Sequence, residues 1–169
     1  MTGEEALAAL QEAAALWSVG SVPATDVISA ACDCLVAGVD SPSLRILAGI
    51  SPASGGESDD LRRWLRDALV ELSLAYYQEG SGEGEEAAVR VMARRLLAGT
   101  ITPPDLTSWA YRYVTAKGSP IAHELVRLDG SYELAQFTDA EVTVLDAEVI
   151  AEARRLAESD PRPVGEAAS

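Results

Sequence analysis

The one histidine of this sequence, His123, is the first residue that could carry acid–base chemistry. Its imidazole has an unperturbed pKa near neutrality, as a general acid or base at physiological pH requires. The surrounding residues predict a short helix whose buried face contains Ile121, Leu125 and Leu128. His123 and Arg127 lie on the opposite face of that helix, so we expect the histidine to be solvated and non-catalytic.

Carboxylates are the other candidates, because two acids held close together can act as acid and base or bind a divalent cation. We assign the pairs Asp59–Asp60 and Glu85–Glu86 to the first turns of helices, where negative charge is favourable. A further acidic group, with Arg127 as its nearby counter-charge in sequence, consists of Asp129, Glu133, Asp139, Glu141, Asp146 and Glu148. This group could form a surface for a basic partner, an ordinary solvated face or a metal site.

The segment LDGSYE, from Leu128 to Glu133, predicts a turn. Tyr132 lies in this turn among acids, and its amphipathic ring is typical of a residue that anchors a protein interface. The predicted partner-binding residues are therefore Asp129, Tyr132, Glu133, Asp139 and Glu141.

The two cysteines, Cys32 and Cys34, point to nearly opposite sides of a predicted helix and cannot easily form a disulfide with each other. Since His123 is the only histidine, the sequence lacks the ligands for a structural Cys/His zinc site. It also lacks a serine-nucleophile elbow, a phosphate-binding glycine loop and a zinc-binding histidine pair. We therefore expect reduced thiols, no metal, no cofactor and no catalytic activity.

Acidic residues outnumber basic ones by 27 to 13 among 169 residues, which gives a formal net charge of −14. Such a field opposes binding to a phosphate backbone and favours a cationic partner, although it can also serve solubility alone. Hydrophobic residues make up 48% of the chain, but no apolar run approaches the ~20 residues that span a membrane. We expect a cytoplasmic protein whose partner is neither a nucleic acid nor a membrane.

Apolar residues recur at spacings of three and four along most of the chain, which predicts an all-α fold of about seven or eight helices. The expected helices begin after the Thr2 cap and at or near residues 24, 42, 58, 85, 103, 120 and 146. The helix over 58–78 is apolar on two sides in its second half, through Val70, Leu74 and Tyr77, and we interpret it as a long central helix. Residues 137–145 fit either a helix capped by Thr138 or an extended segment.

Two stretches of the sequence repeat one pattern, LVAGVDSP from Leu35 to Pro42 and LLAGTITP from Leu96 to Pro103. Each places a glycine at a helix end, then a Ser or Thr cap, then a proline at the first position of the next helix. They predict two similar helix-turn-helix corners in an irregular bundle. We expect a single domain over residues 1–158, with 79–84 as the candidate flexible joint, and a disordered tail over 159–169.

The run ARRLLAGTITPPDLTSWAYRYV, from Ala93 to Val114, followed by LVRLDGSYE resembles small helical immunity proteins of bacterial toxin systems, such as the colicin D immunity family. There, too, a helix ends in a small loop of the type L-x-x-G-x-I-T, and the next helix begins with an acidic residue and an aromatic stripe. The resemblance covers about a quarter of the chain. It implies an acidic, all-helical protein that plugs the basic active site of a cognate RNase-type toxin.

The hypothesis that we favour is a non-catalytic protein whose acidic face, around residues 129–141, binds and neutralises a basic protein partner. An alternative is a helical scaffold or accessory subunit that oligomerises through apolar surface such as Val70, Leu74 and Tyr77. A carboxylate-based enzyme is the third hypothesis, and it requires a carboxyl group of strongly raised pKa inside a cleft.

Overall fold

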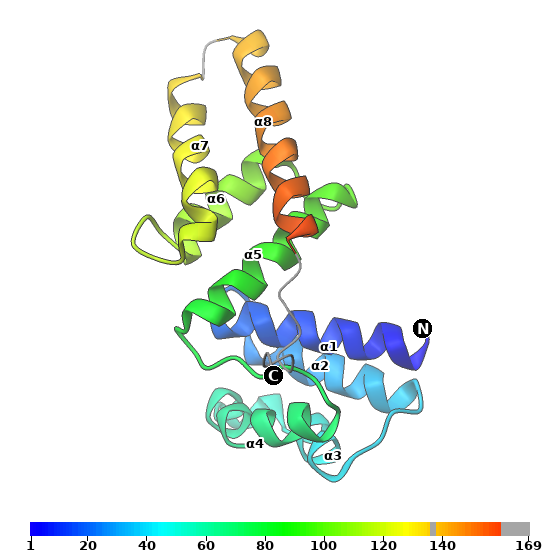
Figure 1. The fold of residues 1–169 in the computed structure, drawn as a ribbon. Helices are drawn as coiled ribbons and strands as arrows, with labels where there is room; N and C mark the ends of the chain where they lie inside the picture. The colour runs from blue at the N-terminus through cyan, green and yellow to red at the C-terminus, as the bar shows by residue number, and fades with distance from the viewer. Residues whose placement is uncertain (136–137, 160–169) are drawn as a thin grey trace, which may run out of the picture. The chain divides into compact units, whose positions relative to one another are not determined.

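The fold is entirely helical in the part of the chain that the structure, a computed structural model, describes: residues 1–135 and 138–159. Eight α-helices and two short 3-10 helices follow one another in these residues, with no strand (Figure 1). The α-helices are α1 (Gly3–Ser18), α2 (Ala24–Val36), α3 (Pro42–Ala48), α4 (Glu57–Glu71), α5 (Gly82–Leu97), α6 (Pro103–Tyr113), α7 (His123–Leu134) and α8 (Asp139–Glu158). The 3-10 helices are η1 (Pro52–Ser54) and η2 (Pro120–Ala122). The prediction of an all-α fold with about seven or eight helices is confirmed.

The chain divides into two compact units, residues 1–88 and 89–169, and the division falls within α5. The predicted joint at 79–84 precedes the division. Within it, Gly80 has a φ of 75° and donates its backbone amide to the Ser18 carbonyl at 3.0 Å. The single domain over 1–158 stays a prediction, and residues 160–169 of the predicted tail lie outside the described residues.

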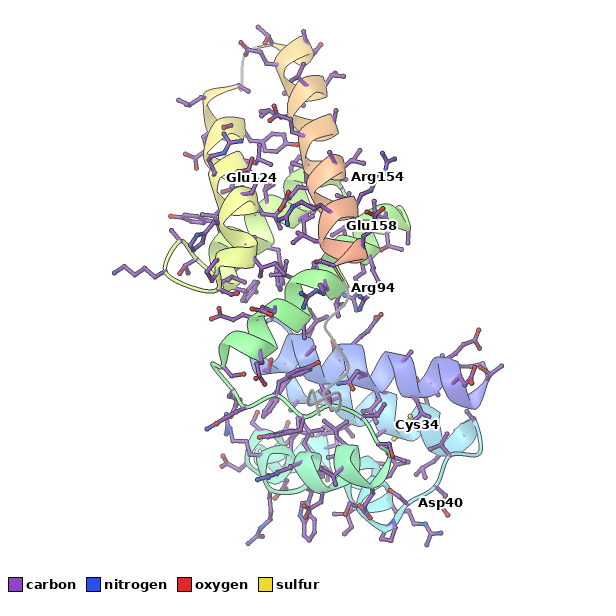
Figure 2. All side chains as sticks on the ribbon, in the orientation of Figure 1. Cys34, Asp40, Arg94, Glu124, Arg154 and Glu158 are labelled. Carbon is purple, nitrogen blue, oxygen red and sulfur yellow. The ribbon has the colours of Figure 1, made fainter. Side chains whose placement is uncertain are left out.

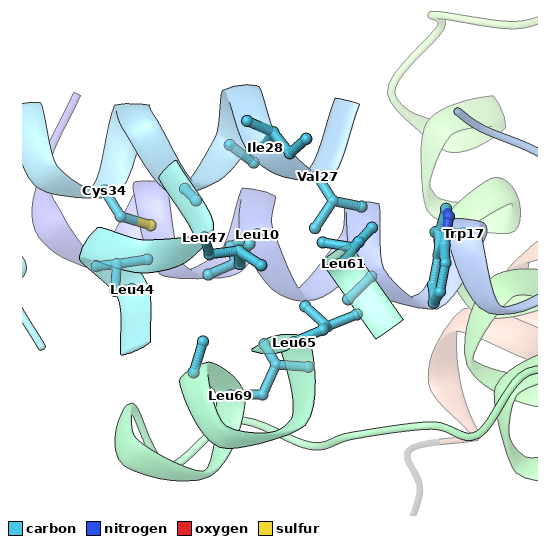
Figure 3. Packing of buried hydrophobic residues seen from close by; sticks show 14 of the residues in the cluster. Leu10, Trp17, Val27, Ile28, Cys34, Leu44, Leu47, Leu61, Leu65 and Leu69 are labelled. Carbon is cyan, nitrogen blue, oxygen red and sulfur yellow. The ribbon is translucent and has the colours of Figure 1, made fainter. Parts of the chain in front are cut away.

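The first unit packs α1, α2, α3 and α4 around one hydrophobic core. Thr2 forms the predicted capping box with Glu5, which sets the start of α1. Leucines from α1, α3 and α4 meet the aliphatic side chains of α2 in the middle of the unit (Figure 3). The large side chains that are fully buried in this core are Leu10, Val27, Leu44, Leu47, Leu61, Leu65 and Leu69. Each buried aliphatic side chain contributes about 1.5–3 kcal/mol, so this shared core is what holds the four helices together.

Helix α4 is shorter than predicted, since it ends at Glu71 and does not extend over 58–78. Ser73 takes a left-handed conformation with a φ of 58°. The Leu74 amide then donates to the Leu69 carbonyl at 2.8 Å, which closes the last turn of the helix. The prediction of a long central helix over these residues is therefore wrong in its extent, and the longest described helix is α8, with 20 residues.

The apolar face predicted for the end of that helix does not form as one surface. Val70 lies on α4 and is 63% exposed, whereas Leu74 lies beyond the helix end and packs against the core of the first unit. Tyr77 follows in the irregular segment that leads to α5. The two-sided apolar pattern arises because the chain changes from helix to irregular structure after Glu71. Beyond that point helical periodicity no longer predicts the side to which Leu74 points.

The second unit contains the C-terminal part of α5 together with α6, η2, α7 and α8. Helices α7 and α8 run antiparallel as a helical hairpin, and α6 packs against both (Figure 1). The buried apolar side chains of the second unit include Leu106, Ala110, Leu125, Leu128, Val149 and Leu156. The hairpin therefore has one face fixed by burial against α6.

The predicted turn from Leu128 to Glu133 is wrong, because these residues form the second half of α7. Leu125, Leu128 and the following Ala135 are buried at helical spacing on the same side. Their burial outweighs the cost of about 1 kcal/mol that a glycine such as Gly130 imposes on a helix. Packing, rather than the local Asp-Gly signal, decides the conformation here.

Residues 139–145 are helical, so the helical alternative is confirmed for this part of the segment that the sequence left open, while residue 137 lies outside the described residues. Helix α8 begins at Asp139 rather than near Asp146. Thr138 occupies the N-cap position, although its side chain makes no capping hydrogen bond. The β-branched residues Val142 and Val144 lower helix propensity by only a few tenths of a kcal/mol, which packing against α7 overcomes.

Both predicted helix-turn-helix corners have the expected local construction. Gly38 and Gly99 take left-handed φ values of 90° and 77° at the ends of α2 and α5. Ser41 and Thr102 accept hydrogen bonds from the amide three residues later, at 3.2 and 3.3 Å, and a proline follows each cap. The repeat in the sequence is thus a way of ending one helix and starting another.

Candidate partner-binding groove

A polar interaction connects α7 and α8 in the hairpin. The Tyr132 hydroxyl donates to Asp146 Oδ1 at 2.5 Å, which joins the second half of α7 to the first half of α8. Towards the other end of the hairpin, Glu124 on α7 (labelled in Figure 2) and Arg155 on α8 carry opposite charges, but Arg155 forms its ion pair with Glu152 on its own helix. Glu124 pairs with Arg127 at 2.5 Å, and the hydrogen bonds from this arginine lower the pKa of the Glu124 carboxyl. The Tyr132–Asp146 hydrogen bond is therefore the direct polar link between α7 and α8 among these groups.

Tyr132 is half-buried between the helices and does not stand in an exposed turn. Partial burial first, and the hydrogen bond to the Asp146 carboxylate second, raise the pKa of its hydroxyl well above the ordinary tyrosine value. The residue predicted as an interface anchor thus stabilises the hairpin from within. Its contribution to a partner contact stays a prediction.

Asp129 also has a partner inside the second unit. Its Oδ1 lies 3.1 Å from the hydroxyl of Thr107, a buried residue of α6. The same hydroxyl lies 3.1 Å from the Pro104 carbonyl, so its single proton serves one acceptor at a time. Asp129 therefore ties α7 to α6, and it is only partly exposed.

An open groove of about 450 Å³ lies between the end of α7 and the beginning of α8. Its lining residues are Ser131, Leu134, Ala135, Ala140, Glu141, Val144 and Leu145. Leu134 is 84% exposed and Val144 is 60% exposed, so two large apolar side chains stand in solvent on facing helices. Exposed apolar residues that occur together in this way mark interaction sites more often than residues scattered singly. We call this feature the α7–α8 groove.

One of the predicted site residues lines this groove, and two more precede its lining residues in the sequence. Glu141 lines it, and Glu133 and Asp139 are next to lining residues in the sequence. All three are exposed, and within residues 1–135 and 138–159 their carboxylates take part in no ion pair or side-chain hydrogen bond. The surrounding stretch of residues 128–153 contains seven acidic residues and no lysine or arginine. Among the described residues, no lysine or arginine therefore pairs with these three carboxylates.

The apolar residues of the groove were not among the residues predicted from the sequence. Leu134 and Val144 fall outside the buried positions of their helices, which include Leu128 and Val149. An apolar residue away from the buried face of a helix is the signal that could have identified them. Following that signal requires both helices to be recognised, and the predicted turn at residues 128–133 prevented this.

The remaining candidates from the sequence lie apart from the groove. His123 is exposed, as predicted. Cys32 and Cys34 are free, and Cys34 is buried in the first unit (Figure 2), where burial raises the pKa of its thiol. Asp59, in the first turn of α4, pairs with Arg62 at 2.8 Å. Among the described residues, no group of three or more His, Cys, Asp or Glu side chains is arranged to hold a metal ion.

Several carboxyl groups have a pKa below their ordinary value. Hydrogen bonds from capping residues lower the pKa of Glu5 and Asp105, and the Arg45 guanidinium lowers that of Asp40. A carboxyl group with a lowered pKa stays ionised near neutral pH, so it can serve as a permanent negative charge but not as a general acid. Among the described residues that line the groove, Glu141 is the one ionisable group. The groove thus suits contact with a cationic, apolar ligand better than catalysis by a carboxyl pair.

Comparisons of this chain with models of protein families, with curated proteins and with solved structures find no match. None of the helices described is both long enough and apolar enough to cross a membrane. The geometry and charge of the second unit are therefore the basis on which a function can be proposed.

Proposed function

We propose that this chain is a non-catalytic protein-binding module that neutralises a basic protein partner. One observation carries the proposal: Glu133, Asp139 and Glu141 are exposed, without counter-charge among the described residues, beside an open apolar groove. Unbalanced charge and exposed apolar surface at one place are typical of a protein interaction site.

The charges of the chain favour a basic partner over an acidic one. With a net charge of −14, the protein attracts a cationic surface from a distance, and this attraction raises the rate of encounter. The apolar groove acts at short range instead, because buried apolar contacts slow dissociation of a complex once it has formed. The two features serve successive stages of one binding reaction.

The class of partner that we propose is an RNase-type toxin. An RNase must bind a phosphate backbone, so its active site carries basic residues that an acidic surface can cover. The resemblance of residues 93–114 and 125–133 to immunity proteins supports this class. We expect the two proteins to meet in the cytoplasm.

Co-expression with the protein encoded by the neighbouring gene tests the proposal. We expect a complex that blocks RNA cleavage by the partner and whose association rate falls steeply as NaCl rises from ~50 to ~300 mM, because salt screens the attraction. The proposal fails if no complex forms with that neighbour and no basic protein is retained in a pull-down.

Charge reversal locates the binding surface. In the triple variant Glu133→Lys, Asp139→Lys and Glu141→Lys, we expect affinity for the partner to fall by about tenfold or more, since attraction becomes repulsion at the site. The matched control reverses Asp26, Asp60 and Asp67, three exposed acids of the first unit, with the same change in net charge. Equal losses of affinity in both variants would show that only the net charge matters, and they would contradict the location of the binding surface at these three residues.

A further inference from the structure

We infer that the α7–α8 groove receives an amphipathic basic segment of the partner, with a large apolar side chain between the helices and lysine or arginine residues beside it. This inference rests on the proposed function and specifies how the partner is recognised. It assigns the central contact to Leu134 and Val144 rather than to the acidic residues.

The size and the walls of the groove favour an apolar side chain as its occupant. Its volume of about 450 Å³ falls within the range of ~300–1,000 Å³ typical of ligand sites. Leu134 on α7 and Val144 on α8 present apolar surface to it, and Ala135 and Ala140 also line it. An apolar group that enters this space removes both exposed side chains from water, and this burial is favourable. Burial against the same side chains would be unfavourable for a polar or charged group.

Charge complementarity selects lysine and arginine as the neighbours of that apolar group. Glu133, Asp139 and Glu141 are exposed and have no ion pair within the described part of the chain. The stems of lysine and arginine can lie along the apolar wall while their charged ends reach these carboxylates. A second copy of this chain would bring the same acids against one another, so like-charge repulsion disfavours it as the occupant.

The groove is already formed in the free protein. The hydrogen bond from Tyr132 to Asp146 joins the two helices at residues that are each next to a lining residue in the sequence. Buried Leu128 and Val149 fix the same helices against the rest of the unit. Because the groove is preformed, little free energy is lost to ordering the protein when a ligand binds. A short segment can therefore be sufficient as a ligand.

Two synthetic helical peptides test the inference by fluorescence anisotropy. The first peptide carries a leucine stripe flanked by lysines, and the second has the same lysines with every leucine replaced by glutamine. We expect the wild-type protein to bind the leucine peptide at least about tenfold more tightly than the charge-matched peptide. In the double variant Leu134→Gln and Val144→Gln, we expect this preference to fall below about threefold.

The control variant carries Leu97→Gln and Val36→Gln, which change an exposed leucine and an exposed valine elsewhere on the protein. We expect it to keep the tenfold preference. Equal binding of both peptides to the wild-type protein would overturn the groove inference, while the proposed acidic surface would still be judged by its own test with the natural partner. Absence of binding by either peptide would overturn it too.

Two further measurements distinguish a binding role of Leu134 and Val144 from a role in folding or in self-association. We expect both glutamine variants to keep the melting temperature of the wild type within about 2 °C, because the substituted side chains are exposed. A much larger decrease for the groove variant alone would show that Leu134 and Val144 support the fold, and it would overturn the inference. Light scattering that shows a wild-type dimer and a monomeric groove variant would overturn it as well, because the occupant would then be a second copy.

Discussion

The hydroxyl of Tyr132 shows how a single residue links the stability of the hairpin to pH. Its ionisation would place a second negative charge beside the Asp146 carboxylate, at an oxygen separation of 2.5 Å, and partial burial adds to this penalty. The folded state therefore keeps the proton at pH values where an unfolded tyrosine, with a pKa of about 10, has lost it. This contribution to stability is fully present below pH ~10 and is lost as pH rises above that value through the folded-state pKa.

We predict that Tyr132→Phe lowers the free energy of unfolding by about 1 kcal/mol at pH ~8, because it removes the hydrogen bond to Asp146. The difference in the free energy of unfolding should narrow as pH rises above ~10, since the variant has no proton to lose at this position. Urea denaturation at several pH values measures this difference. Tyr111→Phe is the control, because Tyr111 is 61% exposed, and a constant difference for Tyr132→Phe across the range would contradict the prediction.

Thr115 offers a second test at the scale of one residue. It follows α6 with a φ of 66°, a left-handed conformation that is costly for a β-branched side chain. Its amide donates to the Ala110 carbonyl at 3.0 Å, so the conformation is required to end the helix. Thr115→Gly should therefore raise the free energy of unfolding by about 0.5–1 kcal/mol.

A matched substitution separates this effect from a general effect of glycine. Thr143 lies inside α8, where glycine costs a few tenths of a kcal/mol relative to threonine, so Thr143→Gly should destabilise the protein. Chemical denaturation of both variants gives the comparison. Destabilisation by both would mean that the left-handed conformation of Thr115 carries no penalty.

At the scale of the helix, two glycines have opposite roles although both lie inside helices. A Cβ atom on Gly84, in α5, would lie 2.5 Å from the Ser18 Oγ and 3.3 Å from the Ser18 Cβ. Ser18 is buried, and its hydroxyl donates to the Ala15 carbonyl, so it has little freedom to move. Gly130 in α7 has no atom within 4 Å of the corresponding position.

We predict that Gly84→Ala destabilises the protein by about 1–3 kcal/mol through overpacking between the start of α5 and the end of α1. Gly130→Ala should stabilise it by about 0.5–1 kcal/mol, because alanine favours the helix and meets open space. Thermal and urea denaturation of the two variants measure both effects. If Gly84→Ala were as stable as Gly130→Ala, the close approach of Gly84 to Ser18 would be wrong.

The boundaries of helices were predictable where a cap specifies them and not where packing does. The capping box at Thr2 and the Gly–cap–Pro corners at Ser41 and Thr102 depend on neighbouring residues in the sequence, and all three form as expected. The end of α4 depends instead on Ser73, a residue that gives no local sign of a left-handed conformation. Gly130 gave a local sign of a turn that burial of the surrounding stripe overrides.

The candidate site shows the same limit. Its acids were visible in the sequence because charge needs no structural context, and Glu141 lines the groove while Glu133 and Asp139 are each next to a lining residue in the sequence. The exposed positions of Leu134 and Val144 depend on which face of each helix is buried, and this is decided by contacts between residues far apart in the chain. Their recognition therefore required the fold of the second unit.

At the scale of the whole molecule, the net charge of −14 acts on the free protein as well as on the proposed partner. Seven of the acidic residues fall within residues 128–153, a stretch that contains no lysine or arginine, and of these seven Glu152 pairs with Arg155 just beyond it. Their mutual repulsion destabilises the folded hairpin, since the unfolded chain can separate the charges further. Added salt screens this repulsion over distances beyond ~8 Å at physiological ionic strength.

We predict that salt has opposite effects on folding and on partner binding. The melting temperature of the free protein should rise as NaCl increases from ~20 to ~300 mM, because the excess of like charge is screened, while the association rate with a basic partner should fall. In the triple variant with lysine at Glu133, Asp139 and Glu141, the rise in melting temperature should be smaller, since the reversed charges relieve the repulsion without salt. Calorimetry at several salt concentrations measures this response. A melting temperature that falls with NaCl would show that the surface ion pairs, such as Arg62–Glu79 and Glu124–Arg127, outweigh the repulsion, and the unbalanced charge would then play no part in stability.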